Sequence, residues 1–185
     1  MYKILSDSPR CFCMQAPTHI LVGSILQQLF KGERLKPLRY FLLAIFAFLL
    51  HGIFDKMAKL TYHPPNANFA DTFWVLYHLV VLLTTVVFIY VWGSEYAWGI
   101  IFSLLPDLDW LFIHGQKIAG VTVDFYNKPY LHNFLHFVID NTFDAINQLP
   151  DFRFYEWSCL FEVALLFILI ILLRSLEKRR RNIHF

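Results

Sequence analysis

Charged residues are scarce in this sequence. Asp, Glu, Lys and Arg together make up 16% of the 185 residues, whereas globular proteins contain about 25%. The net charge of +2 is too small to indicate binding to nucleic acid, which relies on many basic contacts to phosphates. We therefore expect no nucleic-acid partner.

Cysteine is also rare. The sequence has Cys11, Cys13 and Cys159 only, an odd number without the spacing of a disulfide framework. These cysteines lie apart in the sequence from the histidines and aspartates that could bind a metal, which argues against a closed structural zinc site built on thiolates.

The beginning of the chain lacks the apolar core of a secretory signal peptide, because Asp7 and Arg10 interrupt it. Residues 1–13 differ in character from the rest of the chain and are predicted to be a disordered extension. Residues 14–175 are predicted to form a single membrane-embedded helical domain, and residues 176–185 a basic cytoplasmic tail.

Apolar residues, in contrast, are abundant: they make up 57% of the chain. A helix that crosses a bilayer needs about 20 predominantly apolar residues, and a shorter amphipathic segment, Ile20–Phe30, could be a tilted, packed span or an interfacial helix. The longer apolar runs are Tyr40–Phe54, Asp71–Trp92, Ala97–Ile113 and Trp157–Leu173. The sequence therefore predicts an all-α, multispan helical membrane protein with four to five transmembrane helices.

Between the last two runs the sequence is more polar. Pro129 predicts a helix that starts near Tyr130, and we expect this to be an amphipathic helix on the outer face. The segments Gly115–Tyr130 and Gln148–Tyr155 are predicted to be loops.

The basic residues predict an orientation. They cluster in the segment 31–39 and again after the last apolar run, at Arg174 and residues 178–181. Since cytoplasmic loops carry an excess of Lys and Arg, both regions are predicted to be cytoplasmic, and residues 115–156 to lie outside. We expect a multi-pass protein of a bacterial inner membrane. Binding of anionic lipid is a second interpretation of the C-terminal basic run.

Asp107 and Asp109 are the most unusual residues, because they lie within an apolar run. An acidic side chain at the centre of a bilayer costs roughly 2.5–3.5 kcal/mol, and a bound cation would offset this cost. A local extended conformation after Pro106 would point both carboxylates the same way. The alternative interpretation is a turn capped by Asp.

Histidines and further aspartates occur with spacings that suit metal binding. Residues four apart share one face of a helix, and His51 and Asp55 stand four apart. The predicted topology brings all candidate ligands to the outer face. The predicted metal ligands are His19, His51, Asp55, His63, Asp107, Asp109, His132 and His136, and the predicted general bases or orienting residues are Asp140 and Asp144.

Imidazole nitrogen and carboxylate oxygen are ligands of zinc, and also of manganese and iron(II). We therefore expect a divalent metal, with zinc favoured. Each histidine pair could instead be a solvated helix face or a local hydrogen bond. His78, within an apolar run, could be a ligand, a residue that orients a ligand, or a packed core histidine.

Four short motifs resemble those of the membrane-bound metal-dependent hydrolases, the YdjM-like group. The motifs are Thr18-His19-Ile20-Leu21-Val22-Gly23, His51-Gly52-Ile53-Phe54-Asp55, Leu104-Leu105-Pro106-Asp107-Leu108-Asp109 and His132-Asn133-Phe134-Leu135-His136. That group is distantly similar to zinc-dependent phospholipase C and P1-type nucleases, which are all-helical. The resemblance implies cleavage of phosphoesters with the help of clustered zinc ions.

These patterns favour a membrane-bound metal-dependent hydrolase, in which the metal activates water for attack on a phosphoester or lipid-linked substrate. The lipid bilayer is then one partner and a lipid or phosphoester substrate another. A metal-ion or proton transporter is an alternative, because intramembrane Asp and His often mark ion paths. A non-enzymatic membrane protein with a structural metal site is a further alternative, whereas the histidines are too few for a di-iron hydroxylase.

Overall fold

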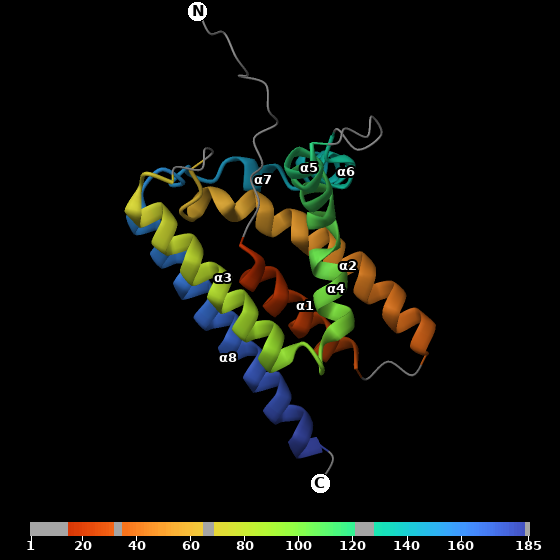
Figure 1. Cartoon of the computed structure of the whole chain (residues 1–185). Helices are drawn as coiled ribbons and strands as arrows, with labels where there is room; N and C mark the ends of the chain where they lie inside the picture. The colour runs from red at the N-terminus through yellow and green to blue at the C-terminus, as the bar shows by residue number, and fades with distance from the viewer. Residues whose placement is uncertain (1–14, 32–34, 65–68, 121–127, 184–185) are drawn as a thin grey trace, which may run out of the picture.

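Figure 1 shows the computed structural model, which describes residues 15–31, 35–64, 69–120 and 128–183. Within these ranges the chain is helical and has no strand, which confirms the all-α prediction. The predicted extension at residues 1–13 lies outside the described residues.

Helix α1 (Ala16–Phe30) lies at the centre of the structure (Figure 1). Pro17 occupies its first turn, where the missing N–H costs no hydrogen bond. Most of its residues are buried, and it packs against α2, α3, α4 and α8. Of the two interpretations of Ile20–Phe30, the structure therefore supports a packed helix.

Helix α2 (Lys36–Met57) places two predicted ligands on its buried face. The buried residues Leu43, Ala47, His51 and Asp55 recur every four positions, the spacing that keeps side chains on one side of a helix. A 3-10 turn, η1 (Ala58–Leu60), comes directly after it. Apolar packing along this face thus carries His51 and Asp55 into the interior.

Helices α3 (Thr72–Trp92) and α8 (Cys159–Ile183) are long, apolar and mostly exposed. Asp71 caps α3, since its carboxylate accepts hydrogen bonds from the N–H groups of Phe73 (2.9 Å) and Trp74 (3.2 Å). Three helical segments of the described chain are long and apolar enough to cross a membrane: Lys36–Leu60, Thr72–Trp92 and Glu156–Asn182. The total of four to five spans stays a prediction.

The apolar run 97–113 forms two helices, α4 (Ala97–Leu104) and α5 (Leu108–Ala119), joined by a 3-10 turn, η2 (Leu105–Asp107). The expected extended conformation after Pro106 is therefore wrong: proline fixes φ near a helical value and the chain continues as a helix. Helix α5 also continues to Ala119, so the loop predicted from Gly115 begins later.

Helix α6 (Tyr130–Thr142) starts directly after Pro129, as predicted, and packs against α2. Helix α7 (Asp144–Asn147) and the 3-10 turn η4 (Glu156–Ser158) lead into α8. Figure 1 shows α5, α6 and α7 together at one end of the structure, opposite the C-terminus. The predicted tail begins as helix, since α8 continues to Ile183.

Candidate metal centre

Five predicted ligands from separate parts of the chain meet at the end of the structure that α5 and α6 cover. His19 comes from the beginning of α1, His51 and Asp55 from the end of α2, Asp107 from η2 and His132 from the first turn of α6. They form two groups of potential metal ligands that share His51: His19, His51 and Asp55, and His51, Asp107 and His132. We call these five residues the candidate metal centre.

Four of the ligand atoms surround one point. The Nε2 atom of His51 lies 3.1 Å from Asp55 Oδ2 and 3.6 Å from Asp107 Oδ1. The Nε2 atom of His132 lies 3.5 Å from the same Asp55 oxygen and 3.7 Å from the same Asp107 oxygen. Ligands at about 2.0–2.2 Å from a tetrahedral zinc ion stand roughly 3.3–3.5 Å apart. Each of the four distances is therefore close to the separation of two ligands on one divalent ion.

The hydrogen bond at the other ring nitrogen of His51 fixes its tautomer. Nδ1 lies 2.7 Å from the carbonyl oxygen of Ser103, and a carbonyl only accepts hydrogen bonds, so Nδ1 carries the proton. In a neutral ring Nε2 then directs a lone pair toward the carboxylates of Asp55 and Asp107. Two electron-rich groups repel each other at this distance, so a cation or a second proton must lie between them.

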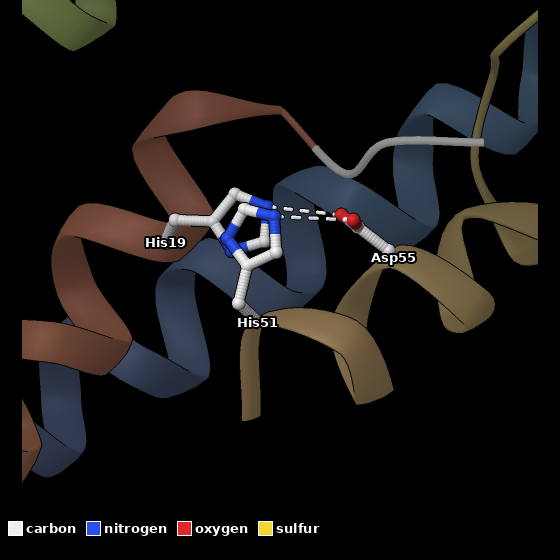
Figure 2. Close-up of side chains that lie close together, drawn as sticks. All are labelled: His19, His51 and Asp55. Atoms are coloured by element: carbon white, nitrogen blue, oxygen red, sulfur yellow. Dashed lines mark ion pairs between the residues drawn. The ribbon is translucent and has the colours of Figure 1, made fainter. Parts of the chain in front are cut away.

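The stacking of His19 and His51 argues against a positive charge on both rings. Their rings are 3.9 Å apart and nearly parallel, at 17°, and Figure 2 shows that both direct a nitrogen toward Asp55. His19 Nε2 lies 3.2 Å from Asp55 Oδ1, and both side chains are completely buried. Two stacked imidazolium ions would repel each other strongly in so apolar a place, whereas two neutral rings can share a site with a metal ion.

Asp109 has a different role from Asp107. Its Oδ2 accepts hydrogen bonds from the backbone N–H groups of Leu131 (2.6 Å) and His132 (3.1 Å). These belong to the first turn of α6, where N–H groups have no partner within the helix, and Pro129 before them has no side-chain acceptor. Asp109 thus fixes the start of α6, and with it the position of His132.

His63 and His136 lie outside both groups of the centre. The Nδ1 atom of His63 lies 3.0 Å from the hydroxyl of Thr61; burial, with nearby His78, lowers the pKa of His63 to about 4. The ring of His136 stands 6.3 Å from that of His132, and burial, with nearby Lys56, also lowers the pKa of His136. Both imidazoles are therefore neutral near pH 7.

The predicted general bases lie beside the centre. Asp140 forms an ion pair with Lys56, at 2.7 Å. Although burial opposes it, this hydrogen bond lowers the pKa of Asp140, which keeps the carboxylate ionised. Asp144 begins α7, but its side chain lies outside the described residues.

The five residues of the centre differ in their exposure to solvent. The side chains of His19, His51, Asp55 and His132 are at most 3% exposed, whereas that of Asp107 is 32% exposed. Of the residues that form the centre, Asp107 is therefore the one that an approaching water molecule or substrate group can reach.

No pattern in the sequence indicated Ser103 or Lys56, whereas Glu162 stands out as an acidic residue within the apolar run 157–173. Ser103 contributes only its backbone carbonyl, which lies near His51. Pro106 has no N–H and therefore cannot donate a hydrogen bond to this carbonyl. Lys56 pairs with Asp140 across two helices. Buried Glu162 accepts a hydrogen bond from the hydroxyl of Tyr77. Every residue has a backbone carbonyl, so the sequence does not show which one binds a side chain. The two side-chain pairs form only where separate helices pack together.

The chain matches no protein-family model, no curated protein and no solved structure. The resemblance to membrane-bound metal-dependent hydrolases therefore rests on the short motifs themselves. Each of the four motifs contributes at least one residue to the candidate metal centre: His19, His51 with Asp55, Asp107, and His132.

Proposed function

We propose that this protein is a membrane-bound metal-dependent hydrolase that cleaves a phosphoester or a lipid-linked substrate. The observation that carries the proposal is the convergence of three imidazoles and two carboxylates, from four separate parts of the chain, of which only Asp107 is partly exposed. A bound divalent ion there would lower the pKa of a coordinated water and polarise a substrate oxygen.

The residues around the centre have distinct parts in this proposal. His51 and His132 bind the ion through Nε2, and Asp55 and Asp107 through the oxygens that lie near both nitrogens. His19 contacts the other carboxylate oxygen of Asp55, Oδ1, through Nε2 and so holds this carboxylate in position. Asp107 is the most exposed of the five residues and is the group nearest an arriving substrate. Asp140 and Asp144 remain the predicted bases.

The first test measures the metal. We expect the detergent-purified protein to contain about one equivalent of zinc, manganese or iron by elemental analysis. His51→Ala and His132→Ala should each lower this content at least about tenfold, since loss of a ligand removes several kcal/mol of binding energy. His78→Ala is the matched control, because His78 bonds the Trp74 carbonyl and belongs to neither group. Equal metal content in all four proteins would contradict the proposal.

The second test measures hydrolysis. We expect the metal-loaded protein to cleave bis(4-nitrophenyl) phosphate or a phospholipid in mixed micelles, and a chelator to abolish this activity. Asp107→Asn should lower kcat by about 100-fold or more, because the variant removes the exposed carboxylate of the site. A protein that holds its metal but cleaves neither compound would favour a structural metal site or a transporter.

A further inference from the structure

A cavity lined by charged residues lies at the opposite end of α1 from the candidate metal centre. It has a volume of about 550 Å³ and lies among the ends of α1, α3 and α8. His19 and Lys31 stand twelve residues apart on or next to α1, about 18 Å along a helix. We call this cavity the basic pocket; its charged lining residues are Lys31, Glu95, Arg174, Glu177, Arg180 and Arg181.

The basic pocket carries an excess of positive charge. Lys31 pairs with Glu95 at 2.7 Å, and Arg174 pairs with Glu177 at 3.0 Å. Arg180 and Arg181 form no ion pair with a carboxylate of the described chain. Both arginines line the cavity, and Arg181 also lies close enough to Glu95 to stabilise its carboxylate. The net positive charge of the lining suits a phosphate group, which arginine binds through two parallel hydrogen bonds.

Buried residues fix the inner wall of the pocket. The hydroxyl of Tyr96, a completely buried residue, donates a hydrogen bond to Glu177 at 2.9 Å. Lys31 lies over the ring of Tyr96 at 4.4 Å, and Arg174 over the ring of Trp92 at 5.3 Å. The paired charges are therefore held in place, and the pocket is a formed site rather than a chance gathering of tail residues.

An apolar groove leads away from the basic pocket between α3 and α8. It has a volume of about 310 Å³, and its wall includes Thr84 and Phe88 of α3 and Leu166 and Ile170 of α8. Arg174 lies one helical turn after Ile170, so the groove ends where the basic pocket begins. Both helices could cross a membrane, and they leave most of their apolar surface uncovered.

We infer that α3 and α8 bind an anionic phospholipid, with its phosphate at Arg180 and Arg181 and an acyl chain in the groove. The net positive charge of the pocket complements the phosphate, and the groove offers an acyl chain an apolar wall that is continuous with the bilayer. Basic pockets between transmembrane helices are a known setting for anionic headgroups. The phosphate lies at the opposite end from the candidate metal centre, so this lipid is bound as a ligand and is not the substrate.

The test uses the full chain, delipidated in detergent, and phosphatidylglycerol as the probe, with bound lipid counted by native mass spectrometry. We expect one tightly bound lipid. The double variant Arg180→Gln/Arg181→Gln should weaken binding about tenfold or more, since it removes charge-assisted hydrogen bonds to the phosphate. The matched control is Lys178→Gln/Arg179→Gln, which removes the same charge from exposed residues outside the pocket and should change the affinity little.

Two outcomes would overturn the inference. An equal loss in both double variants would mean that only the overall charge of the C-terminal segment matters. Competition by glycerol 3-phosphate as effective as that of the lipid would mean that the groove holds no acyl chain. Thr84→Trp, which fills the groove, should weaken lipid binding. Asp107→Ala should leave lipid binding unchanged, so the lipid measurement does not depend on the metal.

Discussion

At the residue scale, Asp107 and Asp109 show how two neighbouring carboxylates acquire different tasks. Asp107 lies 3.7 Å from the Nε2 atom of His132. Asp109 lies 3.7 Å from Nδ1 of the same ring and in addition accepts a hydrogen bond from the backbone N–H of His132. If Asp107 binds a metal as proposed, its removal and the removal of the capping residue Asp109 have different effects. The two aspartates can therefore be separated by experiment.

We expect Asp109→Ala to lower the free energy of unfolding by about 0.5–2 kcal/mol, the usual cost of losing a helix cap. Because the cap positions His132, metal affinity should fall only moderately. Asp107→Ala should lower metal content strongly and leave the stability of the metal-free protein nearly unchanged. Thermal unfolding of the metal-free variants, together with elemental analysis, measures both effects. The same loss of stability in both variants would contradict the distinction.

At the element scale, the contact between α1 and α4 depends on two glycines. A Cβ atom built on Gly23 would lie 2.2 Å from the carbonyl oxygen of Gly99, and one on Gly99 would lie 2.1 Å from that of Gly23. These are backbone atoms, so the helices themselves would have to separate. Small residues commonly allow such close approach between membrane helices. This contact also positions Ser103, whose carbonyl orients His51.

Gly99→Ala should therefore lower the free energy of unfolding by about 1–3 kcal/mol, the cost of overpacking, and should also weaken metal binding. The control is Gly115→Ala in α5, where an added Cβ meets no atom within 4 Å. Alanine favours a helix over glycine by up to about 1 kcal/mol, so this variant should be as stable as the natural protein or more so. Thermal unfolding in detergent compares the two, and an unaffected Gly99→Ala variant would contradict the close contact.

At the scale of the whole molecule, the helices run alternately between two ends. Helices α5 and α6 lie at one end and the C-terminal part of α8 at the other (Figure 1). The residues of the candidate metal centre belong to the first end, and those of the basic pocket to the second. The candidate ligands thus lie at one end of the structure, whereas the membrane orientation of that end stays a prediction. The basic residues predict that the end with the pocket faces the cytoplasm.

Labelling of single cysteines tests this orientation. In a variant without the three natural cysteines, Gln148→Cys lies at the end with the metal centre and Ser94→Cys at the end with the basic pocket; both positions are exposed. In right-side-out vesicles an impermeant maleimide should label residue 148 directly and residue 94 only after permeabilisation. The reverse pattern would mean that the candidate metal centre faces the cytoplasm.

The sequence by itself determined the helical class and the residue types of the site. Apolar runs and the proline at Pro129 are local signals, and they set the start of α6 and the courses of α3 and α8. The four-residue spacing of His51 and Asp55 likewise predicted that they share one face of a helix. Such features depend on neighbours within a turn or two, which a sequence displays directly.

Only the tertiary structure decided which candidates meet. His51 gathers with His19, Asp107 and His132 because α1, α4 and α6 pack against or near α2, whereas Asp109 turns to α6 although it lies two residues from Asp107. The orienting carbonyl of Ser103 and the glycine contact behind it are likewise features of packed backbones. Contacts between distant helices depend on how their surfaces fit, and no local spacing encodes that fit.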